Sequence, residues 1–365
     1  MKTNKLITAV LLAALLLALA ACGQSNTART PASSGNLVPA ATQTPATTAP
    51  VFSETPAPTE AQPEYDAALP VNVMVLNGTT GFGMANLIYA AESGEAALNY
   101  SFSVETDASN VTAALVNGSA DIAALPTNAA AALYNKTSGG VQALALNTLG
   151  VLYLVTDGSV EVNGFEDLRG RTVYAPAQNP TFIFQYLCEA NGLTVGEDVV
   201  IDNGYAQPAD LNAAVSGGLV PLAVLPEPMV TVARSSNDAL AVALDLTAEW
   251  DKVAPAGSLV QGCVVVRTAF AAEHPAEVAK FLEEYGASVD GLLNDVEGTA
   301  AHIEATGVFA KAAVAAKAIP NCNVCFITGA EMQDALGEFL EIMYGVAPAS
   351  VGGAVPGDDF YYIAG

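Results

Sequence analysis

Basic side chains are scarce in this chain of 365 residues, which has 12 Lys and Arg against 37 Asp and Glu and a formal net charge of −25. A protein that binds nucleic acid or an anionic membrane surface by charge needs clustered Lys or Arg. The composition therefore argues against both as partners. It says nothing about the fold, because net charge governs solubility and association instead.

Histidine and cysteine are also few, at two and five. His274 and His302 have no metal-ligand spacing, and no nucleophile-and-base set or phosphate loop is recognisable, so we predict no catalytic residue, metal site or cofactor. Cys322 and Cys325 form a Cys-x-x-Cys pair. The sequence leaves open whether they form a small disulfide or remain buried or half-buried thiols.

Residues 1–22 have the pattern of a secretory signal. Two lysines precede an apolar run, residues 6–21, that is short for a membrane-spanning helix of about 20 residues. The run ends in Leu-Ala-Ala-Cys, which resembles the lipobox of bacterial lipoproteins. We expect cleavage before Cys22, attachment of diacylglycerol to its thiol through a thioether bond, and a further N-linked acyl chain such as palmitate. The alternative is an ordinary signal peptide followed by a chance Cys.

Residues 23–68 are dominated by Ala, Pro, Thr and Ser. Such a composition offers little apolar surface to bury, so we predict a disordered tether. Residues 69–365 are more than one hydrophobic core usually accommodates. We therefore expect two lobes in this part of the chain.

An internal repeat supports the two lobes. Both copies have the same predicted order: strand, turn, helix, extended segment, helix, strand and helix. In the first copy these elements are residues 71–76, 78–81, 82–91, 100–104, 111–116, 121–125 and 129–134. In the second copy they are residues 171–177, 178–181, 182–190, 199–201, 210–215, 221–225 and a helix that begins at Glu227. The segments "VNGSADIAALP" and "VSGGLVPLAVLP" are also similar in sequence. Strand–helix alternation indicates parallel α/β layers. The fold class predicted is α/β, with two similar lobes around a ligand cleft.

The segment "NGTTGFG", residues 77–83, follows the first strand. Ligands of open α/β sheets lie beyond the carboxyl ends of the strands. Glycine lets a backbone approach a ligand closely, and the first N–H groups of the next helix have no internal partner. The segment is neither G-x-G-x-x-G nor a P-loop, so on its own it indicates only a ligand-facing turn.

Four segments together carry a family resemblance: "NGTTGFG", "NGSADIAALPTNAA", "LRGRTVYAPAQNPT" and "AVLPEPMV", in this order. With the lipobox and the tether, they resemble the ABC-transporter solute-binding lipoproteins of the nitrate/sulfonate/bicarbonate class. That class has the type II periplasmic-binding-protein fold. The resemblance covers most of the chain, and its motifs are moderately specific.

The resemblance implies that the chain crosses twice between the lobes. "GVLYLVTDG" at 150–158 and "GSLVQGCVVVRT" at 257–268 are the expected crossings. The first lobe would comprise residues 69–156 and 264–365, and the second residues 157–263. The helical pattern at 275–293 would belong to the returning part of the first lobe.

The resemblance also implies a function. The protein would be the extracytoplasmic component of an ABC importer, lipid-anchored to the cell membrane, and would deliver a small solute to an ABC permease as a monomer. One alternative is a sensory lipoprotein that binds a solute and signals to a membrane kinase. A less favoured alternative is an enzyme on the same fold, since neither histidine lies near a cleft loop.

The ligand contacts that the resemblance implies are the positions just past the strands. They are Thr79, Thr80, Gly81, Phe82, Thr127, Asn128, Gln178, Asn179, Thr181 and Glu227. Thr127 and Asn179 could instead be helix N-caps, and Glu227 could merely complement a helix dipole. Phe82 could belong to the core.

None of these loops contains Lys or Arg. Strongly anionic ligands are often held by a basic side chain. A doubly charged anion is therefore disfavoured, and a neutral, singly charged or aromatic heterocyclic solute is expected. An exposed Glu227 would suit a cationic or N–H-rich group.

Overall fold

The computed structural model describes residues 64–363. By its internal contacts the chain divides into Met1–Thr59 and Glu60–Gly365, and the description below concerns the second unit alone. The predicted signal peptide, Cys22 and the predicted tether up to residue 63 lie outside the described residues. None of the helices in the described part is long and apolar enough to cross a membrane.

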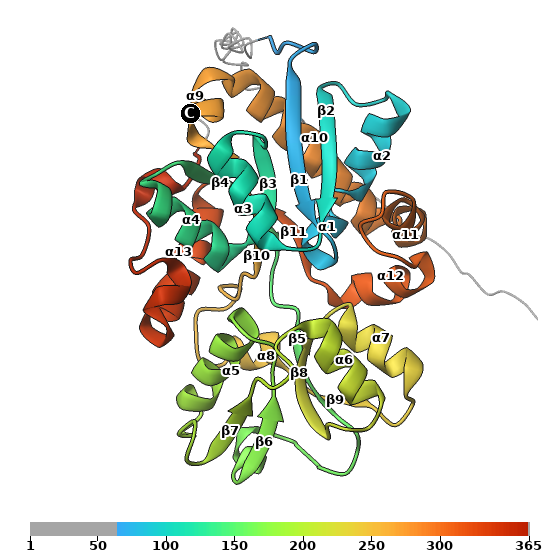
Figure 1. The fold of residues 1–365 in the computed structure, drawn as a ribbon, viewed down its shortest axis with the longest axis vertical. Helices are drawn as coiled ribbons and strands as arrows, with labels where there is room; N and C mark the ends of the chain where they lie inside the picture. The colour runs from blue at the N-terminus through green and yellow to red at the C-terminus, as the bar shows by residue number, and fades with distance from the viewer. Residues whose placement is uncertain (1–63, 364–365) are drawn as a thin grey trace, which may run out of the picture. The chain divides into compact units, whose positions relative to one another are not determined.

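The first lobe is built on a six-stranded sheet with the order β11-β4-β10-β3-β1-β2 (Figure 1). Its strands are β1 (Pro70–Leu76), β2 (Asn99–Glu105), β3 (Ile122–Pro126), β4 (Val141–Thr148), β10 (Gly262–Arg267) and β11 (Val324–Ile327). β1 runs parallel to β2 and β3, whereas β10 runs antiparallel to β3 and β4. The central strands are near-continuous apolar runs because helices cover both faces of the sheet.

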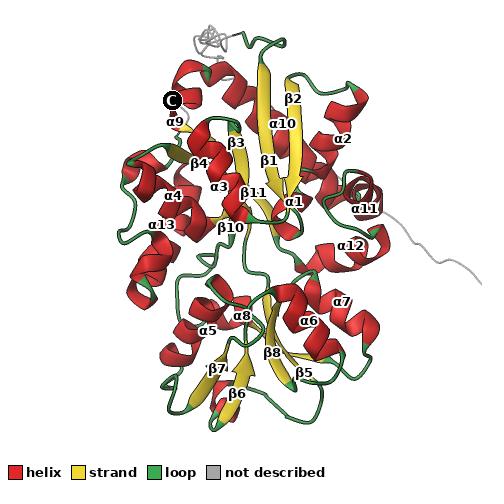
Figure 2. Cartoon of the chain, viewed as in Figure 1, coloured by secondary structure: helices red, strands yellow, loops and turns green. Residues whose placement is uncertain are grey.

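The helices of the first lobe lie on both sides of this sheet (Figure 2). They are α1 (Thr79–Phe82), α2 (Ala85–Ser93), α3 (Ala108–Asn117), α4 (Thr127–Thr137), α9 (Thr268–Glu273), α10 (Pro275–Asn294), α11 (Val296–Ala305), α12 (Ala312–Ala318) and α13 (Gly329–Val346), with short 3₁₀ turns η2 (Ile319–Asn321), η3 (Pro348–Val351) and η4 (Asp358–Phe360). One apolar cluster includes α2, α10 and α11, and a second includes α3, α4 and α13. The helix predicted from Pro275 is confirmed, with Pro in the first turn where its missing N–H costs nothing.

The second lobe has a five-stranded sheet with the order β7-β6-β8-β5-β9. Its elements are β5 (Leu152–Thr156), η1 (Phe165–Leu168), β6 (Arg171–Tyr174), α5 (Asn179–Ala190), β7 (Val199–Asp202), α6 (Pro208–Ser216), β8 (Leu222–Pro226), α7 (Met229–Ser236), β9 (Ala241–Asp245) and α8 (Leu246–Trp250). β6 is parallel to β7 and β8, and β5 is antiparallel to β8 and β9.

The two sheets have the same internal arrangement. Strands β2-β1-β3-β10-β4 of the first correspond in order and direction to β7-β6-β8-β5-β9 of the second. The predicted α/β fold with two similar lobes is confirmed. In each sheet the strand that directly follows a crossing, β10 or β5, runs antiparallel to both of its neighbours, so each lobe is completed by chain arriving from the other.

The crossings are shorter than the sequence predicts. β5 pairs with β8 and β9 of the second sheet, so the outward crossing is residues 149–151, and the second lobe begins before residue 157. β10 starts at Gly262, inside the first sheet, which ends the return crossing near residue 261. An apolar run does not reveal where strand pairing begins. The Val151 N–H donates to Gln261 Oε1 over 2.7 Å and ties the two crossings together.

Beside the crossings the lobes share apolar contact. The single tryptophan, Trp250 of α8, is fully buried, with its ring 5.9 Å from that of Phe339 on α13 and 4.8 Å from that of Tyr186 on α5. Its Nε1–H donates to Ser258 Oγ of the return crossing over 2.8 Å. The first-lobe core on the α13 side is therefore continuous with the second-lobe core on the α5 side.

The cysteines in the described part are free thiols. Cys188, Cys263 and Cys322 are fully buried, and Cys325 is half-buried. Burial raises the pKa of Cys188 and Cys263 to about 12, so neither is an active nucleophile at neutral pH. Cys322 and Cys325 of the Cys-x-x-Cys pair are therefore separate thiols and do not form a disulfide.

Candidate functional site

The turn after β1 needs its glycines. Gly78 has φ 88° and ψ −155°, which side-chain-bearing residues rarely adopt. A Cβ on Gly81 would lie 2.4 Å from the Leu76 carbonyl oxygen. The tight turn presents Thr79 to the second lobe, and the Thr79 hydroxyl donates to the Glu227 carbonyl oxygen over 2.7 Å in a buried contact.

Two further predicted residues stabilise this region from inside the first lobe. Phe82 is fully buried, packs edge-on against Phe309 with ring centroids 6.1 Å apart, and so belongs to the core. Thr127 is also fully buried, and its hydroxyl donates to the Val260 carbonyl oxygen of the return crossing over 2.8 Å. Asn128 beside it is 8% exposed, and its amide has no hydrogen-bond partner among the described residues.

The corresponding turn of the second lobe precedes α5. Gln178 has φ 69° and ψ −136°, close to the backbone conformation of Gly78 at the equivalent place in the first lobe. A residue with a Cβ is strained in this conformation, and such strain tends to persist at functional sites. Asn179 is 7% exposed and its Oδ1 atom has no partner. Thr181 has a structural role: it donates to the Pro176 carbonyl oxygen.

Neither Thr127 nor Asn179 is an N-cap. The capping positions are Pro126 and Gln178, and neither makes a side-chain capping bond. α5 begins three residues earlier than its apolar spacing predicts, because Pro180 is accommodated in the first turn. The capping alternative for these two residues is therefore wrong.

Glu227 lies at the end of β8 and is 4% exposed. Its carboxylate accepts hydrogen bonds from the Thr231 N–H over 3.1 Å and from the Thr231 hydroxyl over 2.9 Å. Burial raises the pKa of this carboxyl above its ordinary value, against the opposing effects of the Thr231 bonds and of Arg234. The condition for a cationic ligand at Glu227, an exposed carboxylate, is not met, because the side chain is buried against the first turn of α7, the helix that follows it.

A hollow of about 730 Å³ opens beside Glu227 and is lined from both lobes. The second lobe contributes Tyr153 and Arg234, and the first lobe contributes Lys317 and Asn321. The Tyr153 hydroxyl donates to the Asn321 carbonyl oxygen over 2.9 Å, a second polar contact between lobes. We use the name interlobe site for three features together: the facing carboxyl edges of the two sheets, this hollow, and the two hydrogen bonds between lobes, Thr79 to Glu227 and Tyr153 to Asn321.

Two residues of the interlobe site were not predicted. Asn147 and Thr148 end β4, are at most 2% exposed, and have Oδ1 and Oγ1 atoms without partners. Asn147 Nδ2 donates to the Thr80 carbonyl oxygen over 3.2 Å. At Gly262 an added Cβ would be 2.2 Å from Asn147 Oδ1, so glycine is required there. A polar pair directly after the apolar run "VQALAL" was the available signal.

The structure thus brings some predicted residues together and leaves others apart. The Thr79 hydroxyl is hydrogen-bonded to the Glu227 carbonyl oxygen, and Thr80 lies in the same turn as Thr79. Thr127 and Asn128 follow β3 on the same sheet edge, and in the opposite lobe Gln178 precedes α5 and Asn179 is its first residue. The unpartnered atoms of Asn147, Thr148 and Asn179 are hydrogen-bonding capacity that the protein itself leaves unused.

Metal chemistry finds no support in the described part. Among residues 64–363, no three His, Cys, Asp or Glu side chains are grouped closely enough to hold a metal ion. The sheet edges instead offer the buried neutral hydrogen-bonding groups of Asn147, Thr148 and Asn179. Such groups suit binding and orientation of a polar molecule.

Neither a family model nor a curated protein sequence matches the chain, but many solved structures do. An ABC transporter protein from Parabacteroides distasonis is similar with a TM-score of 0.69 and 23% identity, covering 81% of this chain and 99% of that one. The aliphatic sulphonate binding protein SsuA from Escherichia coli has a TM-score of 0.64 and 15% identity, covering 78% and 95%. The chain has the periplasmic-binding-protein fold.

A third similar structure shows how much of this fold is shared. The alkanesulfonate-binding protein SsuA from Xanthomonas axonopodis pv. citri, solved with MOPS bound, has a TM-score of 0.59 and 13% identity, covering 80% of this chain and 96% of that one. Nearly the whole length of each of these proteins therefore matches, so the expectation of a periplasmic-binding-protein fold is confirmed. Proteins of this fold close by hinge motion around a ligand.

Two matched pairs of substitutions separate binding from stability. If a solute binds between these sheet edges, Asn128→Ala and Asn179→Ala should weaken its binding about threefold to a hundredfold, because each variant would remove one hydrogen bond to it. Their effect on the melting temperature should be small, since Asn128 has no partner among the described residues and Asn179 Oδ1 has none. Thr127→Val and Thr181→Val should instead lower the melting temperature, because each leaves a carbonyl oxygen without its donor.

Calorimetric titration and thermal unfolding of the same four variants test this division. If the two Asn variants bind as the parent protein does, the solute does not contact these edges. If the two Thr variants unfold as the parent does, their hydroxyl bonds contribute nothing to stability.

Burial of Glu227 predicts a pH dependence. Because the folded-state pKa is raised, the stabilisation from this group is present below the unfolded pKa and is lost as pH rises through the folded value. Glu227→Gln does not titrate there. The melting temperature of the variant relative to the parent should therefore rise as the pH increases above the unfolded-state pKa of about 4. Glu92→Gln, at an exposed site, should show a flat difference. A relative loss of stability in Glu227→Gln over this range would mean that the Thr231 bonds outweigh burial.

Proposed function

We propose that the protein is the extracytoplasmic solute-binding component of an ABC importer, which captures a small solute at the interlobe site and delivers it to a membrane permease. The supporting observation is the pairing of two similar lobes whose facing edges hold buried polar atoms without partners. Buried polar groups normally have partners, so these atoms favour a bound polar molecule at the site. The similar structures include solute-binding proteins by their printed names.

The charges of the interlobe site favour a solute of low net charge. Three acidic side chains, Glu227, Asp238 and Asp245, line the hollow together with two basic ones, Arg234 and Lys317, so the two signs nearly balance. The predicted edge loops carry no Lys or Arg. The two sulphonate-binding proteins named above bind an anion, and we expect a different preference here. A neutral or zwitterionic polar solute fits these groups, and a doubly charged anion does not.

A thermal-shift screen of small solutes tests the proposal. Neutral and zwitterionic polar compounds should include at least one that raises the melting temperature in a dose-dependent way, as a ligand of the folded state does. Sulfate at the same ionic strength should not. The shift should shrink in Asn128→Ala and Asn179→Ala. A hit whose shift is unchanged in both variants would contradict binding at the interlobe site, and a hit list of dianions would contradict the preference.

We also propose that Cys22 carries the lipid that holds the protein at the outer face of the cell membrane, with residues 23–68 as the tether. The support is the sequence alone: an apolar run ending in Leu-Ala-Ala-Cys ahead of a Pro-rich and Thr-rich segment. Two or more acyl chains give durable anchoring, whereas a single chain holds only marginally.

Cys22→Ala tests the anchor. The variant should leave the membrane fraction and appear in the soluble extracytoplasmic fraction or the medium, because it has lost the thiol that would carry lipid. Cys188→Ala, which removes a buried thiol of the second lobe, is the control and should remain with the membrane. Retention of Cys22→Ala in the membrane fraction would refute lipid attachment at this residue.

A further inference from the structure

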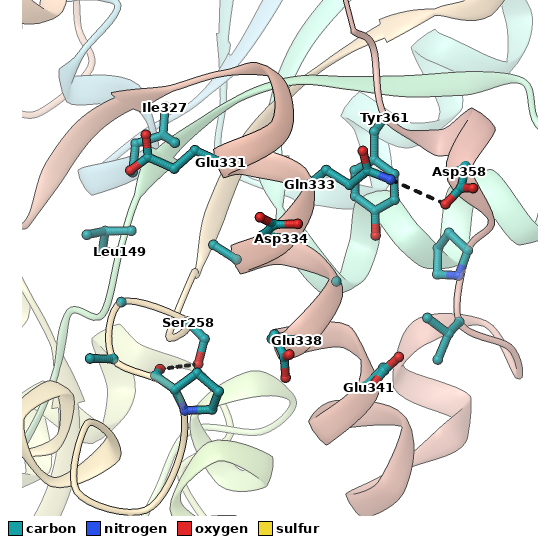
Figure 3. A pocket seen from close by; sticks show the side chains of 17 residues that line it. Leu149, Ser258, Ile327, Glu331, Gln333, Asp334, Glu338, Glu341, Asp358 and Tyr361 are labelled. Atoms are coloured by element: carbon teal, nitrogen blue, oxygen red, sulfur yellow. Dashed lines mark hydrogen bonds between the residues drawn. The ribbon is translucent and has the colours of Figure 1, made fainter.

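A second hollow, of about 950 Å³, lies away from the interlobe hollow and runs along α13. Five carboxylates line it, and the lining contains no Lys, Arg or His; they are Glu331, Asp334, Glu338, Glu341 and Asp358. Figure 3 shows four of them on the helix and Asp358 on the C-terminal segment opposite. We call this the acidic hollow. Its charge is of one sign, in contrast to the mixed charges of the interlobe hollow.

The four helical carboxylates follow a regular spacing. Positions 331, 334, 338 and 341 are separated by three, four and three residues, so they share one face of α13. Successive turns of a helix are about 5.4 Å apart along its axis. Like charges at these separations destabilise a helix, and here no opposing cation lines the hollow to relieve them. The four carboxylates are exposed, so water screens their repulsion in part, and a bound cation would reduce what remains.

Tyr361 supplies an independent sign of a ligand. It is 7% exposed and is fixed in place because the Tyr362 N–H donates to the Ala143 carbonyl oxygen over 2.9 Å. The Tyr361 hydroxyl nonetheless has no hydrogen-bond partner among the described residues, and it points into the hollow (Figure 3). Burial raises the pKa of Tyr361 to about 12, with Asp358 and Glu341 adding to the effect. The hydroxyl thus stays protonated and can accept a hydrogen bond from an ammonium group.

The spread of charge argues against a single metal ion. The carboxylates are distributed over three turns, and the described part of the chain has no group of side chains that could hold a metal. Apolar surface lies among them, from Leu149 and Pro255 of the crossings and from Ile327, Val355 and Pro356. A hydrated divalent ion gains no binding free energy from contact with apolar surface. A ligand with cationic groups joined by methylene chains does gain from it, because the chains bury apolar area while the cationic groups contact carboxylates.

We propose that the acidic hollow binds a linear polyamine. Ammonium groups separated by three or four methylene groups lie about one helical turn apart, which matches the carboxylate row on α13. The Tyr361 hydroxyl accepts a hydrogen bond from one ammonium group, and the apolar residues contact the methylene chain. This site is separate from the interlobe site and does not depend on the function proposed there. Because residues from both crossings line the hollow, an occupant contacts the segments that join the lobes.

Calorimetric titration of the full chain with spermidine, at fixed ionic strength, tests the proposal. The parent protein should bind one spermidine, with a rise in melting temperature. The triple variant Glu331→Gln, Glu338→Gln, Glu341→Gln should bind about tenfold or more weakly, because three ion pairs are lost. Tyr361→Phe, which removes only the hydroxyl, should bind about twofold to tenfold more weakly.

A matched control separates a built site from general attraction to an acidic protein. The control is a second triple variant, Glu92→Gln, Glu95→Gln, Glu297→Gln, which also removes three negative charges. Glu92 is exposed on α2, Glu95 in the turn between α2 and β2, and Glu297 on α11. This variant should bind spermidine within about twofold of the parent, since screening weakens distant charges. Equal losses in the two triple variants, multiple weak sites, or equally tight binding of Mg²⁺ would each overturn the proposal.

Discussion

The hydrogen bond from the Thr79 hydroxyl to the Glu227 carbonyl oxygen joins the two lobes at their facing sheet edges, and the interlobe site depends on it. The bond forms because Gly78 and Gly81 allow a turn that brings Thr79 past the end of β1. On the other side, the Glu227 N–H donates to the Val151 carbonyl oxygen of the outward crossing over 2.9 Å. One residue of the second lobe is thus tied to both the first lobe and the hinge. Opening the lobes must break the Thr79 contact, and a solute that bridges the edges would offset that loss.

The interlobe contacts are unevenly distributed. On the α13 side, Trp250 and Phe339 join two apolar cores, which is a strong but non-directional contact. At the sheet edges the contacts are few and polar, and the oxygens of Asn147, Thr148 and Asn179 remain without partners. Apolar contact can hold the lobes near one another while the polar edges determine what is enclosed. Specificity then resides in the hydrogen bonds, because a site built to bond a polar group rejects molecules that lack it.

Much of the fold follows from the sequence. The repeat predicts β1, β2 and β3 of the first lobe and β6, β7 and β8 of the second, together with the helices between them, since strand–turn–helix order leaves a local signal in apolar spacing and in Gly and Pro positions. It does not predict β5 and β10 as inserted antiparallel strands, because each pairs with strands of its own sheet that lie far away in the sequence. Asn147 was not predicted as a site residue because the predicted site residues lie where a strand leads into a helix, whereas β4 leads into a crossing. The orientation of Glu227 was missed because its partner, Thr231, lies four residues ahead on the next helix.

Small-angle scattering on the unit Glu60–Gly365, with and without a solute found by screening, tests the central claim that the lobes close over a solute. Without solute, the lobes should open at the Thr79–Glu227 contact, and the radius of gyration should exceed that of the structure described here. With saturating solute it should fall to that value, because the edges are bridged. A radius that is the same with and without a solute known to bind would contradict closure of the lobes and would indicate a rigid site.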